Sequence, residues 1–166
     1  GMRFLPMLLA LLLPLSAAHA AAPAPRVTAS TADAFGRVAD AVFTDRTAAL
    51  LDEAPTARTA LRATTAGVQV PDTLARTENT AVSSLHGTRS RLAALGEAYS
   101  AADTKVTVNR TRVTGRLATV WVTEATTLTY RKIRGDEPAT TGFRAHHVLT
   151  FAAGPHGGWK LTGERS

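Results

Sequence analysis

Glu124 and Tyr130 are the side chains whose types and spacing best suit acid–base chemistry in this sequence. They have the same parity within a run of strand character, so both should point to one face of a sheet. Arg144 and His147, from a later run of the same character, could lie beside them on one concave surface. Proton transfer needs a carboxylate base near a desolvated hydrogen-bond donor, and these residue types could supply both.

A structural interpretation competes with this one. Glu124 could instead pair with Arg144 across neighbouring strands on an exposed sheet face, an ion pair that would contribute at most about 1 kcal/mol. We favour the structural interpretation and assign no catalytic residue. Glu124, Tyr130, Arg144 and His147 together form a candidate pocket.

The adjacent histidines His146 and His147 suggest a metal site at first sight. Neighbours on a strand face opposite ways, so the two rings cannot chelate one ion without a bulge, and more ligands of suitable type would be needed. His147 shares its parity with Phe143, Leu149 and Phe151, which favours a hydrogen-bonded core residue. The chain has no Cys, which excludes thiolate sites and a Cys nucleophile. We expect no metal and no cofactor.

The 166-residue chain carries a net charge of +6, which permits attraction to anionic partners such as wall polymers. The Arg residues are scattered, and few exposed aromatic residues stand between them, so nucleic-acid binding is not supported. A basic sheet edge is possible, and charged edges also discourage aggregation between strands. That edge would consist of Arg110, Arg112, Arg116, Arg131 and Arg134.

Residues 1–20 resemble a secretory signal peptide, with Gly1 interpreted as an expression remnant. Arg3 precedes a long apolar run, and Ala18-His19-Ala20 forms a small-x-small cleavage site, so cleavage is expected after Ala20. An uncleaved membrane anchor over residues 4–22 is the alternative. A Pro/Ala tether over residues 21–27 and a single α+β domain over residues 28–166 should follow. We therefore expect a secreted, extracellular protein of bacterial origin.

Two long helices are expected in the first part of the domain. Apolar residues at helical spacing predict the first from Ser30 or Thr31 to residues 52–53, ahead of Pro55. Asp72 or Thr73 can cap the second, which should run to about residue 100.

Four strands are expected after the helices. The central one covers residues 116–131, with strands at 105–113 and 141–152 on either side and a short closing strand at 159–161. A change of phase at Val113 indicates a bulge. The predicted fold is α+β, with N-terminal helices packed on one face of a curved, cone-like, four-stranded antiparallel sheet.

The later half of the chain resembles a known fold family. The motifs that carry the resemblance are Thr123-Glu124, Leu128-Thr129-Tyr130, His147-x-Leu149 and Gly158-Trp159-Lys160-Leu161. They are similar to the nuclear transport factor two-like (cystatin-like) α+β module, and in particular to the region that precedes the amidase domain in secreted bacterial proteins. These are mostly packing residues, so the resemblance concerns the fold more than the function.

The resemblance implies a non-catalytic ligand-binding or accessory module of the cell envelope, since an amidase domain would bring a Cys nucleophile that this chain lacks. A small-molecule or cell-wall ligand is one expectation, and a homodimer formed through the sheet face is another. The alternative is a ketosteroid-isomerase-like enzyme. In such relatives a carboxylate and a Tyr on the cone wall transfer protons, which points to Glu124 and Tyr130 with His147.

Overall fold

The computed structural model describes residues 26–54 and 57–166. The expected signal peptide and nearly all of the tether lie outside the described residues. The fold is α+β, with two helices and a six-stranded mixed sheet. Over the described ranges, no helix combines the length and the apolar character that spanning a membrane requires.

Helix α2 spans Ala29–Ala48 and helix α3 spans Asp72–Ala94. The side chain of Thr28 caps α2 by accepting a hydrogen bond from the backbone N–H of Thr31. The second helix ends earlier than predicted because Gly96 adopts a φ of 81°, a conformation that terminates helices. The chain from Tyr99 onward is strand, not helix.

The predicted meander is present; its central strand is one residue shorter at each end than predicted, and the other three strands are longer. It consists of β3 (Tyr99–Thr114), β4 (Leu117–Tyr130), β5 (Thr140–Ala153) and β6 (Trp159–Arg165). Strand β4 pairs antiparallel with β3 on one side and with β5 on the other, which confirms the predicted neighbours of the central strand.

The prediction of a four-stranded antiparallel sheet was wrong. Two short strands, β1 (Thr64–Thr65) and β2 (Val68–Gln69), extend the sheet, and β2 runs parallel to β6. The strand order is β1-β2-β6-β5-β4-β3. Strands of two residues are too short to show an alternating pattern, so only contacts between distant segments reveal them.

The bulge of β3 lies between Val108 and Arg110, not at Val113 as predicted. From Ala101 to the bulge, the odd-numbered residues of β3 pair with outward residues of β4; after the bulge, the even-numbered residues do. The extra residue, Asn109, thereby turns Arg110 and Arg112 to the face away from the helices.

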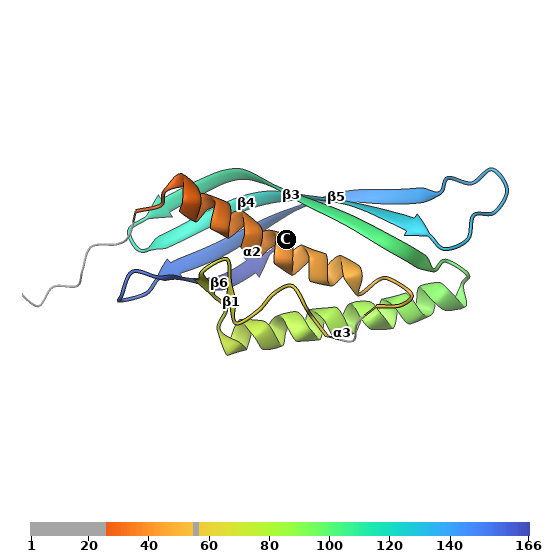
Figure 1. The fold of residues 1–166 in the computed structure, drawn as a ribbon, viewed down its shortest axis with the longest axis horizontal. Coiled ribbons are helices and arrows are strands. Elements are labelled where there is room, and N and C mark those ends of the chain that lie inside the picture. The colour runs from red at the N-terminus through yellow and green to blue at the C-terminus, as the bar shows by residue number, and fades with distance from the viewer. Residues whose placement is uncertain (1–25, 55–56) are drawn as a thin grey trace, which may run out of the picture.

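Both helices lie on one side of the sheet, with α2 against it and α3 beneath α2 (Figure 1). The core between them is apolar, with Phe35 of α2 stacked on Phe151 of β5 at 4.1 Å between ring centroids. Strand β4 contributes its even positions, such as Val120 and Val122, which are fully buried. No helix of the described residues covers the opposite side of the sheet, here called the outer face.

Candidate functional site

Glu124 and His147 meet inside the protein, between the sheet and α2. The Oε1 atom of Glu124 lies 2.8 Å from Nε2 of His147, and the two residues are only 4% and 7% exposed. Their strands place them there: Glu124 is an inward position of β4, and His147 lies opposite Val122, another inward position. The sequence prediction of a hydrogen-bonded, buried His147 agrees with this contact.

A chain of threonine hydroxyls continues from Glu124. Thr126 donates to Oε2 of Glu124 at 2.9 Å and lies 3.0 Å from the hydroxyl of Thr104. Thr104 in turn lies 2.7 Å from the hydroxyl of Thr47, which donates to the carbonyl of Phe43 at 2.9 Å. These bonds link β4, β3 and α2 through polar groups that would be costly to bury without partners.

A cluster of charged side chains lies on the other side of His147, and the sequence did not predict it. Arg46 of α2 donates to both carboxylate oxygens of Glu78 at 2.6 and 3.1 Å, and to Glu164 of β6 at 2.8 Å. Burial lowers the pKa of Arg46, but its hydrogen bonds and attraction to Glu78 and Glu164 outweigh burial and raise it. The Nδ1 atom of His147 lies 3.5 Å from Glu164 and 3.0 Å from the hydroxyl of Ser166.

Phe43 closes this network from the helix side. Its ring stacks on His147 at 4.0 Å between centroids and 21° between planes, and the guanidinium of Arg46 lies 5.3 Å from the same ring. The described residues contain no group of three or more His, Cys, Asp or Glu suited to a metal ion. The Glu124 carboxylate and the His147 imidazole are hydrogen-bonded to protein groups, and the Phe43 ring packs over the imidazole. These contacts connect α2 to the sheet.

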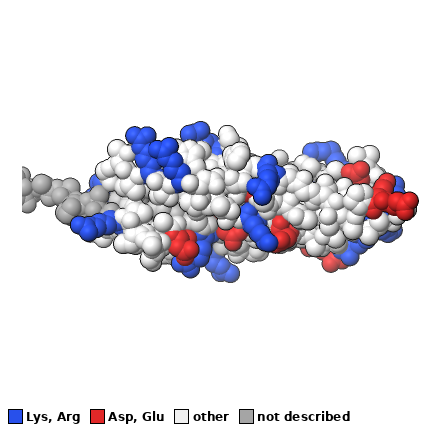
Figure 2. Space-filling view, turned by 90° about the horizontal axis from the view of Figure 1, so that it is seen from above, with Lys and Arg blue, Asp and Glu red and all other residues white. Residues whose placement is uncertain are grey.

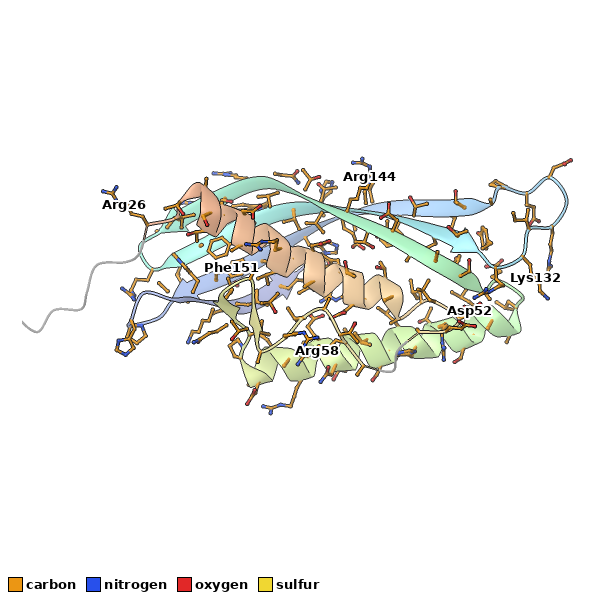
Figure 3. All side chains as sticks on the ribbon, in the orientation of Figure 1. Arg26, Asp52, Arg58, Lys132, Arg144 and Phe151 are labelled. Carbon is orange, nitrogen blue, oxygen red and sulfur yellow. The ribbon has the colours of Figure 1, made fainter. Side chains whose placement is uncertain are left out.

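Tyr130 and Arg144, the other two residues of the candidate pocket, lie elsewhere. Tyr130 packs against Tyr99 at 5.2 Å between ring centroids; burial, and then Tyr130, raise the pKa of Tyr99. Arg144 is opposite Ala125 and therefore projects from the outer face, away from the helices (Figure 3). The structure thus brings together Glu124 and His147 alone, and the suggested Glu124–Arg144 ion pair does not form, because the two side chains point to opposite faces.

The outer face collects the strand cations. Every Lys and Arg within β3, β4, β5 and β6 is paired, on the neighbouring strand, with a residue that points to the outer face. Within the described part of the chain, no ion pair joins any of them to a carboxylate. The residues are Lys105, Arg110, Arg112, Arg144, Lys160 and Arg165.

Acidic side chains are scarce on the same face. Of the carboxylates in these four strands, Glu124 and Glu164 point inward, and only Asp103 lies at an outward position. Seen from the side on which Arg144 projects, Lys and Arg groups stand along the upper and central surface (Figure 2). Asp and Glu groups gather at the hairpin end and along the lower edge, where Lys and Arg groups lie as well. The outer face is therefore cationic.

Neutral polar groups and one aromatic ring occupy the middle of the outer face. Asn109 donates to the hydroxyl of Thr123 at 2.7 Å, and that hydroxyl lies 3.2 Å from Nδ1 of His146. In the next row, the guanidinium of Arg110 lies 5.0 Å from the ring centroid of Trp121. The cations come from β3, β5 and β6, and the outward residues of β4 are uncharged.

The Arg residues that the sequence suggested as one basic edge lie at different places in the structure. Arg110 and Arg112 lie on the outer face, Arg116 bonds the carbonyl of Gly154, and Arg131 holds Asp52. Sequence parity could not place Arg110 and Arg112 on the outer face, because the bulge at Asn109 changes the parity of every later residue of β3.

The Asp52–Arg131 pair joins the segment after α2 to the end of β4. Nε and Nη2 of Arg131 donate to the two carboxylate oxygens of Asp52 at 2.6 and 2.8 Å. The hydrogen bond from Arg131 lowers the pKa of Asp52 below its ordinary value of 3.8. The folded state thus favours the ionised form, so the stabilisation exists above the ordinary pKa and is lost as the pH falls through the lowered one.

Asp52→Asn is accordingly expected to lower the melting temperature modestly at pH 7. The difference from the wild type should shrink below about pH 4 and vanish in stronger acid, where both chains are uncharged at residue 52. Melting curves between pH 2 and 7 measure it. A difference that stays constant across this range would show that the pair's charge contributes nothing.

No protein-family model matches the chain, and no curated protein matches it. A solved structure, the crystal structure of the intermembrane space region of chloroplast protein ARC6, is similar at 14% identity and a TM-score of 0.38. The similarity covers 78% of this chain and 94% of that chain. A likeness this weak supports no argument about fold family or function.

Proposed function

We propose that this chain is an exported, non-catalytic binding module of the cell envelope, and that the outer face of its sheet is the binding surface. The observation that supports the proposal is that the polar groups on the two faces of the sheet differ in their partners. The inward polar groups bond one another, whereas the outward cations have no carboxylate partner among the described residues. A surface that exposes unpaired charges and hydrogen-bonding groups is suited to recognition.

An enzyme of the ketosteroid-isomerase type is the second candidate, and the Glu124–His147 contact is the observation in its favour. The geometry favours it less. The carboxylate is buried and bonded to Thr126 as well as His147, and Tyr130 packs against Tyr99 instead. A substrate would have to displace Phe43 from its stack on His147 before reaching the carboxylate.

Export after cleavage at Ala20 and membership of the nuclear transport factor two-like family are further parts of the proposal. The apolar run and small-x-small site in residues 1–20 support export. Helices followed by a meander, with both helices on one side of the sheet, support the family. An amidase domain beside this module in a longer protein would suit an accessory binding role.

Co-sedimentation with bacterial cell envelopes tests the proposed function. The chain from residue 21 onward is expected to pellet with purified envelopes. Ala125→Trp, which adds a bulky uncharged side chain at an outward position of β4, should reduce that fraction severalfold. Ala93→Trp, at an exposed position of α3, is the matched control and should pellet like the wild type. A wild-type chain that stays in the supernatant would contradict the proposal.

A further inference from the structure

We propose that the outer face binds an acidic polysaccharide, one whose sugar rings carry carboxylate groups. This inference rests on the proposed function and specifies its ligand. It starts from the cations of the outer face, which lie on both sides of strand β4, whose outward residues are uncharged. Arg110 and Arg112 stand on β3, Arg144 stands on β5, and Lys160 and Arg165 stand on β6.

The spacing of these cations suits an extended polymer better than a single small anion. Outward positions along a strand repeat every two residues, or roughly 7 Å, and neighbouring strands lie about 5 Å apart. Arg110, Trp121, Val148 and Arg165 form one row across the four strands, and Lys105, Ala125 and Arg144 form another. The charges are therefore distributed over several strands of the outer face, and guanidinium groups bind planar carboxylates through paired hydrogen bonds.

The uncharged groups between the cations suit sugar hydroxyls. Thr123 and Asn109 are already oriented by their mutual hydrogen bond, with His146 at the end of the row. Thr150 lies two residues farther along β5 than Val148, and the hydroxyl of Thr162 donates to it at 3.0 Å. Hydroxyls, an amide and an imidazole can both donate and accept, as a ligand covered with hydroxyl groups requires.

The same surface is poorly suited to a membrane or to nucleic acid. Among the strongly exposed large apolar side chains, Leu117 alone lies at an outward position of these strands, so the face has little to insert into lipid. Single-stranded nucleic acid needs exposed aromatic rings for base stacking. Trp121 is the aromatic residue of the outer face, and the guanidinium of Arg110 already lies over its ring.

Binding to polygalacturonate oligomers tests the inference, with the fully methyl-esterified oligomers as the control because esterification removes the charge and keeps the sugar chain. By calorimetry at low salt, the wild-type chain should bind the acid form, and binding of the ester should be at least tenfold weaker. The double variant Arg110→Glu, Arg144→Glu should lose about tenfold or more in affinity. Arg62→Glu, Arg76→Glu changes the net charge equally outside the outer face and should bind like the wild type.

The outcomes separate this inference from the proposed function. Pelleting with envelopes but no binding to polygalacturonate would overturn the inference and leave the function standing. Equal binding of acid and ester forms, or tighter binding to oligothymidylate or to anionic phospholipid vesicles, would also overturn it. No pelleting with envelopes would contradict the function itself. Melting temperatures of both double variants establish that each is folded, and an outer-face variant that is folded but binds normally would count against the inference.

Discussion

Replacing Arg46 with Met is expected to lower the free energy of unfolding by about 3 kcal/mol. The substitution keeps an unbranched side chain about as long as the aliphatic stem of Arg46 and removes the guanidinium, which leaves Glu78 and Glu164 without their shared cation. Removing one partner of a buried ion pair usually costs about 3–5 kcal/mol because the remaining charge is buried and uncompensated. The lower end applies here, since the side chain of Arg46 is 21% exposed, against 8% for Glu78 and 12% for Glu164. Denaturant unfolding at pH 7 measures the change.

Two further variants make the Arg46 experiment specific. Arg37 lies on the same helix and pairs with Asp33 at 3.3 Å, but both side chains are more than half exposed. Arg37→Met should therefore cost no more than about 0.5 kcal/mol. The triple variant Arg46→Met, Glu78→Leu, Glu164→Leu should recover much of the lost stability, because no unpaired charge remains. If Arg46→Met is as mild as Arg37→Met, the cluster does not hold the helices to the sheet.

Phe35→Ala is expected to destabilise the protein by about 3–5 kcal/mol, the usual cost of removing a large buried ring and leaving a cavity. Phe35 is 0% exposed, stacks on Phe151 at 4.1 Å and meets Trp159 edge to face at 5.4 Å. Since Phe35 comes from α2 and its partners come from β5 and β6, the loss should weaken the contact between helix and sheet. Denaturant unfolding gives the free energy, and tryptophan fluorescence of a Trp121→Phe background, in which Trp159 is the remaining Trp, reports the region around Trp159.

Phe143→Ala is the matched control for that substitution. Phe143 is on β5, the strand of Phe151, but it is 41% exposed, so its truncation should cost about 1 kcal/mol or less. Similar losses for the two substitutions would mean that the Phe35 cluster is not the centre of the core.

The strand pattern was readable from the sequence because it depends on neighbours along the chain. Alternating apolar residues in β4 predicted the central strand, and its pairing with β3 and β5 is confirmed. The end of α3 could not be read in the same way. The apolar pattern continues to Tyr99, and only the turn at Gly96 and the pairing of Tyr99 with Tyr130 convert that segment to strand.

The candidate site also has one part that the sequence predicted and another that depends on contacts between distant segments. The apolar neighbours of His147 predicted a hydrogen-bonded core residue, and the structure confirms this. Its partner, Glu124, lies on another strand, and the register of β4 and β5 brings the two side chains together. Arg46 gave no signal in the sequence, since a cation at one edge of an amphipathic helix normally points to solvent. Its partners, Glu78 and Glu164, come from α3 and β6.

The sequence by itself determined the α+β class, the two long helices before the four-stranded meander and the neighbours of the central strand, because periodicity and turn residues act over short stretches of chain. The tertiary structure decided which groups meet. The bulge at Asn109 turns Arg110 and Arg112 outward, and the register puts Arg144 beside Ala125 and Glu124 against His147. A shift of one residue moves a side chain to the opposite face of the sheet. The separation of an inward network of hydrogen-bonded polar groups from a cationic outer face could therefore arise only from the assembled sheet.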